Sequence, residues 1–336
     1  MKPDNHIYIP PKKVGVLMVN LGTPEATNYI SMWKYLREFL SDKRIIELPR
    51  FFWYPILFFI ILVVRPKRSG RLYDKIWNKK LNKSPLKVFT ESIALKLGQS
   101  FDKKKVIIKY AMNYGFPKIN VEMQKMMTEG CEKILIFPMY PQYSATTTAS
   151  VIDRVYEFLR KTRWQPTVRV VPPYYDDRIY IDALKKHVEN EEKKRKEKFD
   201  KIICSFHGIP KKYFFKGDPY HCQCAKTVRL LNEKYKKKQK FEMSFQSRFG
   251  PQEWLRPYMN EKMDELIKED KRSLVIMAPG FSVDCLETLE EINMEGKEEF
   301  MEKGGKNFFY ISCLNDTKPG IDMYKKIIKR ELLGWV

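Results

Sequence analysis

Histidine and glutamate are the side chains of this sequence best suited to moving protons or holding a metal ion. His207 directly follows the segment "KFDKIICSF", whose apolar and β-branched residues predict a buried strand. Gly208 and Pro210 then end any regular element. An imidazole, with a pKa of about 6.5, can accept a proton near neutral pH or bind a metal ion. A histidine at a strand end can equally just hydrogen-bond to a neighbouring carbonyl, so His207 alone predicts no reaction.

Three glutamates add a second chemical element. Glu287, Glu291 and Glu295 recur at every fourth position, which places them on one face of a helix. Like charges at this spacing destabilise a helix, so the stripe is either a solvated surface or a functional feature. Asp284, which follows a predicted strand, is a candidate N-cap of this helix. Carboxylates that lead out of a cleft can hold a divalent cation such as Fe(II), or they can carry protons.

These residues need a scaffold, and the order of predicted elements indicates its class. Short β-rich segments alternate with helical ones, which predicts an α/β protein with two open, doubly wound parallel sheets. The chain should divide near residues 165–175. The predicted strands are 14–20, 105–112, 133–139, 167–173, 201–206, 241–247, 273–279 and 307–314.

The loops that follow these strands should border one cleft, because ligands of open α/β sheets bind at the carboxyl ends of strands. The loops are residues 20–24, 139–150, 205–210, 246–254 and 279–292. Their aromatic residues either pack the domain interface or form flat walls for a large planar ligand. These aromatic residues are Tyr140, Tyr143, Phe249, Trp254 and Phe281. No glycine pattern typical of phosphate binding occurs, so a nucleotide cofactor has little support.

The overall charge is strongly basic. The 336 residues include 63 lysines and arginines against 41 acidic residues, which gives a net charge of +22. Such an excess fits nucleic acid, an anionic membrane, an anionic substrate or a lysine-rich solvated surface. The basic runs at 191–198 and 234–240 favour the solvated surface because they resemble exposed, charge-rich helix faces.

Cysteine usage and the N-terminal segment predict a reduced cytosolic protein. The six cysteines are scattered, and no apolar signal-peptide core opens the sequence. The segment "HCQC" (221–224) is a weak metal motif because no second closely spaced pair accompanies it.

Residues 51–64, "FFWYPILFFIILVV", carry no charge, and we call them the lip. The lip is shorter than the roughly 20 residues that span a bilayer. Arg50 precedes it, and Arg65 and Lys67 follow. The lip is therefore either a buried core helix or an apolar surface that rests on a membrane while the cations meet lipid headgroups.

Six long motifs together resemble the ferrochelatase family. They are "VNLGTPEA", "YLREFLSDKRIIELPR", "YPQYSATTTAS", "SFHGIPKKYFFKGDPY", "SFQSRFGPQEWLRPY" and "GFSVDCLETLEEI". The resemblance extends from about Val14 to the terminal "ELLGWV". It implies two Rossmann-like domains with a cleft between them, expected at 1–168 with the lip and at 169–336 with His207 and the Glu287 helix. The terminal helix is expected to pack back on the first domain.

The resemblance also implies an activity and a site. Members of the family are lyases that insert Fe(II) into protoporphyrin IX, releasing two protons and forming protohaem in the last step of haem biosynthesis. The implied catalytic and iron-binding residues are His207 and Glu287, and Glu291 and Glu295 continue an acidic path. The implied porphyrin pocket is lined by Leu21, Tyr114, Tyr140, Ser247, Trp254 and Phe281. Whether His207 acts as base, iron ligand or both in turn stays open.

Three further groups of residues follow from the resemblance. Phe39 and Leu40 would adjoin the lip, and Arg65, Lys67 and Arg248 would meet the porphyrin propionates. Asn113 stands where many members have an arginine.

The expected partners are the porphyrin and ferrous iron, with iron as a substrate and no tightly bound cofactor. A [2Fe–2S] cluster is not expected, because Ala145 replaces a cluster cysteine of animal members and no cysteine follows Cys313. We expect a cytoplasmic monomer in peripheral contact with the inner membrane, without nucleic acid. The alternatives are a cobalt or nickel chelatase of the same fold, a non-catalytic tetrapyrrole carrier and a nucleic-acid binder.

Overall fold

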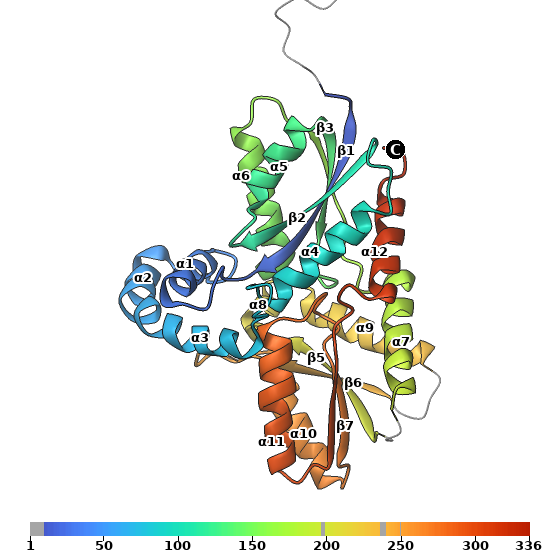
Figure 1. Ribbon diagram of the computed structural model, residues 1–336. Coiled ribbons are helices and arrows are strands. Elements are labelled where there is room, and N and C mark those ends of the chain that lie inside the picture. Colours follow the sequence, from blue (N-terminus) through green and yellow to red (C-terminus); the bar gives the residue numbers. More distant parts are fainter. Residues whose placement is uncertain (1–9, 196–198, 236–239, 249) are drawn as a thin grey trace, which may run out of the picture.

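The computed structural model describes residues 10–195, 199–235, 240–248 and 250–336, and it contains two four-stranded parallel sheets (Figure 1). The first sheet has the strand order β2-β1-β3-β4 and the second has the order β6-β5-β7-β8. The strands are β1 (Lys13–Gly22), β2 (Val106–Tyr114), β3 (Cys131–Pro138), β4 (Thr167–Val170), β5 (Lys201–His207), β6 (Phe241–Gln246), β7 (Ser273–Met277) and β8 (Asn307–Ile311). All eight predicted strands are confirmed, with small differences at their ends.

The two sheets have the same topology. In each, the first strand lies between the second and the third, and the fourth forms an edge. The chain therefore leaves the first strand toward one side of the sheet and later returns to its other side. This reversal creates a topological switch point, where open α/β sheets bind their ligands. The loops after β1, β3, β5 and β7 are thus the ones placed to hold a ligand.

Helices cover both faces of the sheets. In the first sheet, α4 packs on one face, and α5 and α6 pack on the other. The α-helices are α1 (Tyr29–Leu40), α2 (Arg50–Ile56), α3 (Leu62–Ile76), α4 (Pro85–Gly98), α5 (Ile119–Thr128), α6 (Ser150–Lys161), α7 (Arg178–Lys193), α8 (Lys211–Phe215), α9 (Tyr220–Lys234), α10 (Met259–Lys268), α11 (Lys297–Glu302) and α12 (Lys318–Glu331). Three π-helical segments, η1 (Leu57–Ile61), η2 (Ala145–Ala149) and η3 (Glu287–Gly296), directly precede α3, α6 and α11.

One hydrophobic core joins the two halves of the molecule. It contains Val16 of the first sheet and Val275 of the second, together with side chains of α4, α7, α9 and α12. The terminal helix α12 contacts α4 as well as α7, so it spans both halves (Figure 1). Residues 167–170 form β4 and pair with β3, so a division between residues 168 and 169 passes through this strand.

The lip has a buried face and an exposed face. Trp53, Leu57 and Leu62 pack into a cluster with α1, whereas Phe51 is 84% exposed and Phe59 is 79% exposed. The buried-core prediction therefore holds for one face of the lip, and membrane contact through the other face stays a prediction. Among the described residues, no helix combines the length and the apolarity needed to cross a bilayer.

Asp218 joins the loop after β3 to the second half of the chain. Its buried carboxylate accepts hydrogen bonds from Ser144 Oγ at 2.9 Å, from Ala145 N at 2.8 Å and from Tyr220 N at 3.1 Å. Hydrogen bonds to a charged acceptor are about twice as strong as neutral ones. Asp218 therefore fixes the position of the 139–150 loop relative to α9.

Replacing Asp218 by alanine removes these three hydrogen bonds and leaves buried donors without an acceptor. We expect the free energy of unfolding to fall by about 2–4 kcal/mol, as measured by urea denaturation. Asp264→Ala is the matched control, because the carboxylate of Asp264 on α10 is solvent-accessible and pairs with Lys303. The control should change the free energy by less than about 0.5 kcal/mol. Equal losses in the two variants would contradict the role given to Asp218.

Candidate active site

The pairing of β5 with β6 positions His207. The two strands are parallel, and His207 lies opposite Gln246 at their carboxyl ends. The next residue, Gly208, donates its N–H to the Gln246 carbonyl oxygen at 2.7 Å. A Cβ atom on Gly208 would lie 2.9 Å from that oxygen and 3.2 Å from the Trp254 ring, so glycine is required here. The loop after β5 therefore turns tightly against Trp254 and leaves His207 at the strand end.

The hydrogen bond of His207 defines its neutral tautomer. Nδ1 of His207 lies 2.6 Å from the carbonyl oxygen of Gly208, which can only accept a hydrogen bond. Nδ1 therefore carries the proton in the neutral ring, and Nε2 keeps its lone pair. Nε2 is thus the atom of this side chain that can accept a proton or bind a metal ion.

Gln246 and Ser247 attach the acidic helix to this strand end. Gln246 Nε2 donates to the Glu287 carbonyl oxygen at 2.8 Å and to Glu291 Oε2 at 3.3 Å. The hydroxyl of Ser247 also donates to the carboxylate of Glu291. Ser247 has a φ of 66°, a left-handed conformation that is strained for a residue with a side chain. This conformation accompanies the contact with Glu291, so Ser247 holds that carboxylate in place.

The helix that carries the glutamates is a π-helix at this point. The sequence spacing predicted an α-helix capped by Asp284, and both parts of that prediction are wrong. The π-helix η3 begins at Glu287, and its i→i+5 bonds widen each turn. The buried carboxylate of Asp284 instead accepts hydrogen bonds from Tyr310 OH at 2.6 Å and from Asn315 Nδ2 at 2.6 Å. Asp284 therefore links the loop after β7 to the segment that follows β8.

The carboxyl group of Glu291 responds to the charges of both Glu287 and His207. Burial and the neighbouring Glu287 carboxylate raise the pKa of Glu291 above its usual range, while Ser247 and His207 oppose this rise. Glu287 also adds to the raised pKa of two buried phenols, Tyr35 and Tyr73, for which burial is the main cause. Because Tyr35 lies on α1 and Tyr73 on α3, the Glu287 carboxylate is close to the first half of the chain.

Glu295 lies apart from this group and has other charged neighbours. It is exposed, and partial burial and the Glu290 carboxylate raise its pKa, while Lys75 and Arg68 lower it. Glu290, which the sequence analysis did not single out, is buried and accepts a hydrogen bond from Lys75 Nζ at 2.6 Å. The acidic stripe therefore runs from half-buried Glu287 and Glu291 to exposed Glu295, with the ion pair of Glu290 beside its outer end.

Tyr114 is held in a polar network of the first domain. Its hydroxyl donates to Asp42 at 2.7 Å and lies 3.0 Å from Ser150 Oγ, and Asn113 Nδ2 donates to the same Ser150 oxygen at 2.8 Å. Arg154 of α6 places its guanidinium 4.7 Å above the Tyr114 ring. A guanidinium thus lies next to Tyr114 although Asn113 occupies the preceding position.

The other predicted pocket residues lie on both sides of the domain interface. Leu21 packs against the core that joins the halves and against the lip cluster, and Phe281 packs against that joining core from the second domain. Tyr140 follows β3, and its buried hydroxyl has no hydrogen-bond partner among the described groups. Trp254 lies beside Gly208, and Phe249 falls outside the described residues.

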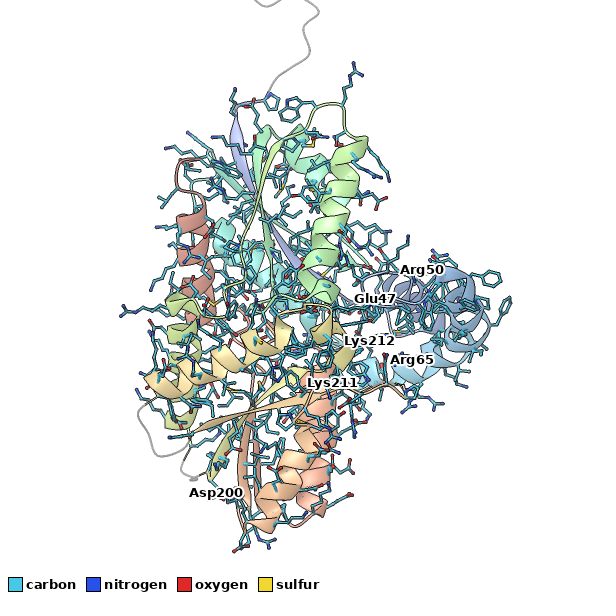
Figure 2. All side chains as sticks on the ribbon, turned by 180° about the vertical axis from the view of Figure 1, so that it is seen from behind. Glu47, Arg50, Arg65, Asp200, Lys211 and Lys212 are labelled. Atoms are coloured by element: carbon cyan, nitrogen blue, oxygen red, sulfur yellow. The ribbon has the colours of Figure 1, made fainter. Side chains whose placement is uncertain are left out.

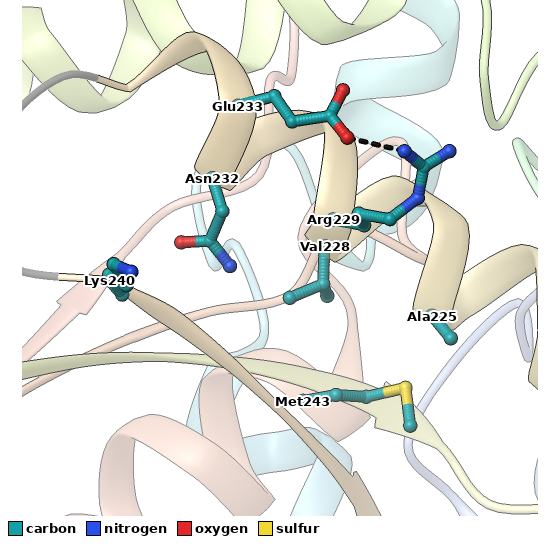
Figure 3. Close-up of a pocket in the computed structure, with 7 residues that line it drawn as sticks. All are labelled: Ala225, Val228, Arg229, Asn232, Glu233, Lys240 and Met243. Atoms are coloured by element: carbon teal, nitrogen blue, oxygen red, sulfur yellow. Dashed lines mark hydrogen bonds and ion pairs between the residues drawn. The ribbon is translucent and has the colours of Figure 1, made fainter.

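Two grooves and the cysteines lie outside this arrangement. A groove of about 500 Å³ lies between α9 and the start of β6 (Figure 3), and another of about 880 Å³ lies along β2; neither is lined by a predicted site residue.

Cys222 is exposed whereas Cys224 is buried, so the two thiols of "HCQC" occupy different environments. Within the described part of the chain, no three His, Cys, Asp or Glu side chains gather into a metal-binding group.

The fold is shared with solved chelatase structures. SirB from Bacillus subtilis with Fe³⁺ has a TM-score of 0.58 at 10% identity, and the similarity covers 95% of each chain. The sirohydrochlorin chelatase SirB from B. subtilis subspecies spizizenii, in complex with cobalt, has a TM-score of 0.51 at 9% identity over 95% of this chain and 94% of that one. The two predicted doubly wound domains are therefore confirmed as a chelatase fold.

Sequence similarity identifies the family within this fold. A model of the ferrochelatase family matches residues 13–332. The ferrochelatase of Allorhizobium ampelinum is 50% identical over 336 residues, which is 99% of this chain and 98% of that protein. This chain belongs to the ferrochelatase family and is a metal chelatase.

The raised pKa of Glu291 predicts a stabilising substitution. A carboxyl whose pKa is higher in the folded state binds more protons there than in the unfolded chain, so it reduces stability as the pH rises above about 4.3. Glu291→Gln removes this unfavourable charge while it keeps an acceptor for Ser247. We expect the variant to be more stable than the unmodified protein at pH 8, with a smaller difference at pH 5, in urea denaturation.

Glu302→Gln serves as the control, because Glu302 is an exposed glutamate of the neighbouring helix α11. It should leave the stability at both pH values nearly unchanged. A Glu291→Gln variant that is less stable at pH 8 would show that its charge is favourable in the folded protein, against the reasoning above.

Proposed function

We propose that this chain inserts ferrous iron into protoporphyrin IX and forms protohaem, with His207, Glu287 and Glu291 as the groups that carry the reaction. Membership of the ferrochelatase family supports the reaction. The arrangement at the carboxyl ends of the second sheet's strands supports the residues. Nε2 of His207 keeps its lone pair, and the charges of His207 and Glu287 both act on the carboxyl of Glu291. In the reaction, Fe(II) binds the four porphyrin nitrogens and two pyrrole protons leave.

His207 is the proposed proton acceptor. A neutral imidazole near pH 7 can take a pyrrole proton directly, and the hydrogen bond of Nδ1 to Gly208 keeps the accepting lone pair on Nε2. The same lone pair can bind Fe(II) before the ion reaches the porphyrin. Both roles use one atom, so they follow each other in time and do not occur together.

The carboxylates of Glu287 and Glu291 are proposed to receive protons and to attract the iron cation. Two nearby carboxylates repel each other, and this repulsion is relieved when one of them binds a proton or when a cation lies beside them. The raised pKa of Glu291 has this cause in part. Glu295, at the exposed end of the stripe, would then exchange protons with solvent.

The walls of the proposed porphyrin site come from both domains. Leu21, Tyr114 and Tyr140 belong to the first domain, and Ser247, Trp254 and Phe281 belong to the second. Two buried oxygens, Thr23 Oγ1 and Tyr140 OH, have no partner among the described groups. Buried polar atoms are rarely left without a partner, so these two oxygens are suited to contact a bound molecule.

Replacing His207 by alanine tests the proton role. We expect kcat for iron insertion to fall by about 100- to 10,000-fold, because the proton acceptor is lost. Protoporphyrin should still bind, as measured by fluorescence quenching under anaerobic conditions. His221→Gln is the matched control, since His221 stacks on Phe245 and is not assigned a role. Iron insertion that survives in His207→Ala would refute the assignment.

The exposed face of the lip is proposed to rest on the cytoplasmic face of the inner membrane. Phe51, Phe52, Phe59, Ile60, Val63 and Val64 are exposed on this face. Figure 2 shows Arg50 and Arg65 on the same projecting part of the molecule. An apolar face flanked by cations binds membranes that contain anionic lipids. A hydrophobic porphyrin would then enter the site from the bilayer.

Substitutions on the exposed face of the lip test this contact. Phe51→Asp with Phe59→Asp should weaken binding to vesicles of phosphatidylethanolamine and phosphatidylglycerol at least ten-fold. Burial of each exposed ring in the membrane would contribute about 1.5–3 kcal/mol to the free energy of binding. Leu95→Asp with Leu333→Asp is the control, because these side chains are 65% and 71% exposed outside the lip. Equal vesicle binding by the lip variant and the unmodified protein would exclude the contact.

We further propose that the reaction needs no iron–sulfur cluster. Ala145 occupies the cluster-cysteine position of the 139–150 loop, and its N–H donates to Asp218. The thiols of Cys204, Cys224, Cys285 and Cys313 are buried, and burial raises the pKa of each, which disfavours the thiolate that ligates a cluster. Ferrous iron is then the substrate, and the porphyrin supplies its final ligands.

A further inference from the structure

The outer edge of β2 offers hydrogen-bonding groups to another strand. β2 is the edge strand of the first sheet, and the Lys105 carbonyl points toward β1, where it accepts from Val14 N at 2.9 Å. Val106 N and Met112 N point the other way, to Asp102 O at 2.8 Å and Pro117 O at 2.7 Å. Because backbone groups alternate along a strand, the N–H and C=O of residues 108 and 110 also point away from β1. None of the described backbone hydrogen bonds outside the sheets uses them.

A groove runs along this edge. It has a volume of about 880 Å³ and is lined by β2, by α4, by α5 and by the 116–118 turn. Three large apolar side chains in its lining are exposed: Leu95 is 65% exposed, Phe116 is 47% exposed and Val121 is 40% exposed. An open strand edge between exposed apolar side chains is the kind of site to which an extended peptide adds as a further strand.

The charges in the groove favour an acidic occupant. Its three glutamates, Glu91, Glu122 and Glu129, are all paired with lysines at 2.5–2.6 Å. The lining lysines Lys13, Lys87 and Lys103 have no ion pair within the described part of the chain. A second copy of this chain would bring its own net charge of +22, so self-association through this edge is opposed by repulsion.

We propose that the β2 groove binds an extended, acidic segment of another protein, which adds to β2 as a strand and places carboxylates next to Lys87 and Lys103. The strand edge supplies the backbone hydrogen bonds, the exposed apolar side chains cover alternate side chains of the segment, and the lysines select for negative charge. The groove shares no residue with the candidate active site, so this binding is a separate property from iron insertion.

Three fluorescein-labelled nine-residue peptides test the proposal by fluorescence anisotropy with the full-length protein in 150 mM salt. The first alternates Val and Glu, the second alternates Val and Lys, and the third is the Val–Glu peptide with alternate backbone nitrogens methylated. The Val–Glu peptide should bind at least ten-fold more tightly than each of the others, because the second has the wrong charge and the third cannot pair with β2. Equal binding by the methylated peptide would overturn the strand addition.

Charge reversal then locates the site. Lys87→Glu with Lys103→Glu should weaken binding of the Val–Glu peptide at least ten-fold, whereas Lys268→Glu with Lys326→Glu, two exposed lysines on α10 and α12, should weaken it less than two-fold. Both double variants should keep the circular dichroism spectrum and the iron-insertion rate of the unmodified protein. Equal weakening by the two pairs would show non-specific attraction to a basic protein and would refute the groove.

Sedimentation of the free protein tests the other occupant. We expect the double variant Lys87→Glu with Lys103→Glu to show the same dependence of sedimentation on protein concentration as the unmodified protein. Association that depends on these lysines would assign the edge to a second copy of this chain and would overturn the proposal.

Discussion

The side-chain amide of Gln246 connects the elements that carry the proposed chemistry. Its Oε1 accepts from Ser205 Oγ of β5 at 2.6 Å, and its Nε2 donates to η3 at the Glu287 carbonyl and at Glu291. The Glu287 carbonyl can only accept, so it fixes which end of the amide is the nitrogen. The main-chain carbonyl of Gln246 also holds Gly208, directly after His207. The amide is buried, so a change in any one of these bonds leaves polar groups that water cannot easily satisfy.

The lip and the candidate site share one side of the molecule. The lip cluster contains Tyr35 and Tyr73, whose pKa values respond to Glu287, and it also packs against Leu286 at the start of the acidic helix. The buried face of the lip thus belongs to the same cluster as Leu286, which directly precedes η3, while its outer face is exposed. Under the proposed membrane contact, an apolar substrate would enter along the exposed face of a segment whose buried face packs in the cluster next to Leu286.

The sequence was sufficient to predict the two sheets, because the core strands are short, largely apolar segments bounded by turns, and most of them contain β-branched residues. The positions of His207 and of the glutamates after strands were also visible locally, whereas their roles stay predictions. Glu290 was not predicted, because its partner Lys75 lies 215 positions away. The same limit applies to Gln246 and Asp218, whose importance depends on groups that the fold brings to them. The faces of the lip could not be separated either, because a segment in which every residue is apolar has no periodicity that marks the buried side.

The repeated strand order has an evolutionary meaning. Two halves with one topology are what gene duplication and fusion would produce, and each half has its own set of loops at the carboxyl ends of its strands. In the proposed site, His207, Glu287 and Glu291 all belong to the second half, whereas both halves supply hydroxyl-bearing and aromatic residues. Mutations in one copy then alter one wall of the ligand site and leave the opposite wall as it was. Under the proposed roles, changes in the loops of the first half could therefore alter the selection of the bound molecule without altering the proposed reactive groups.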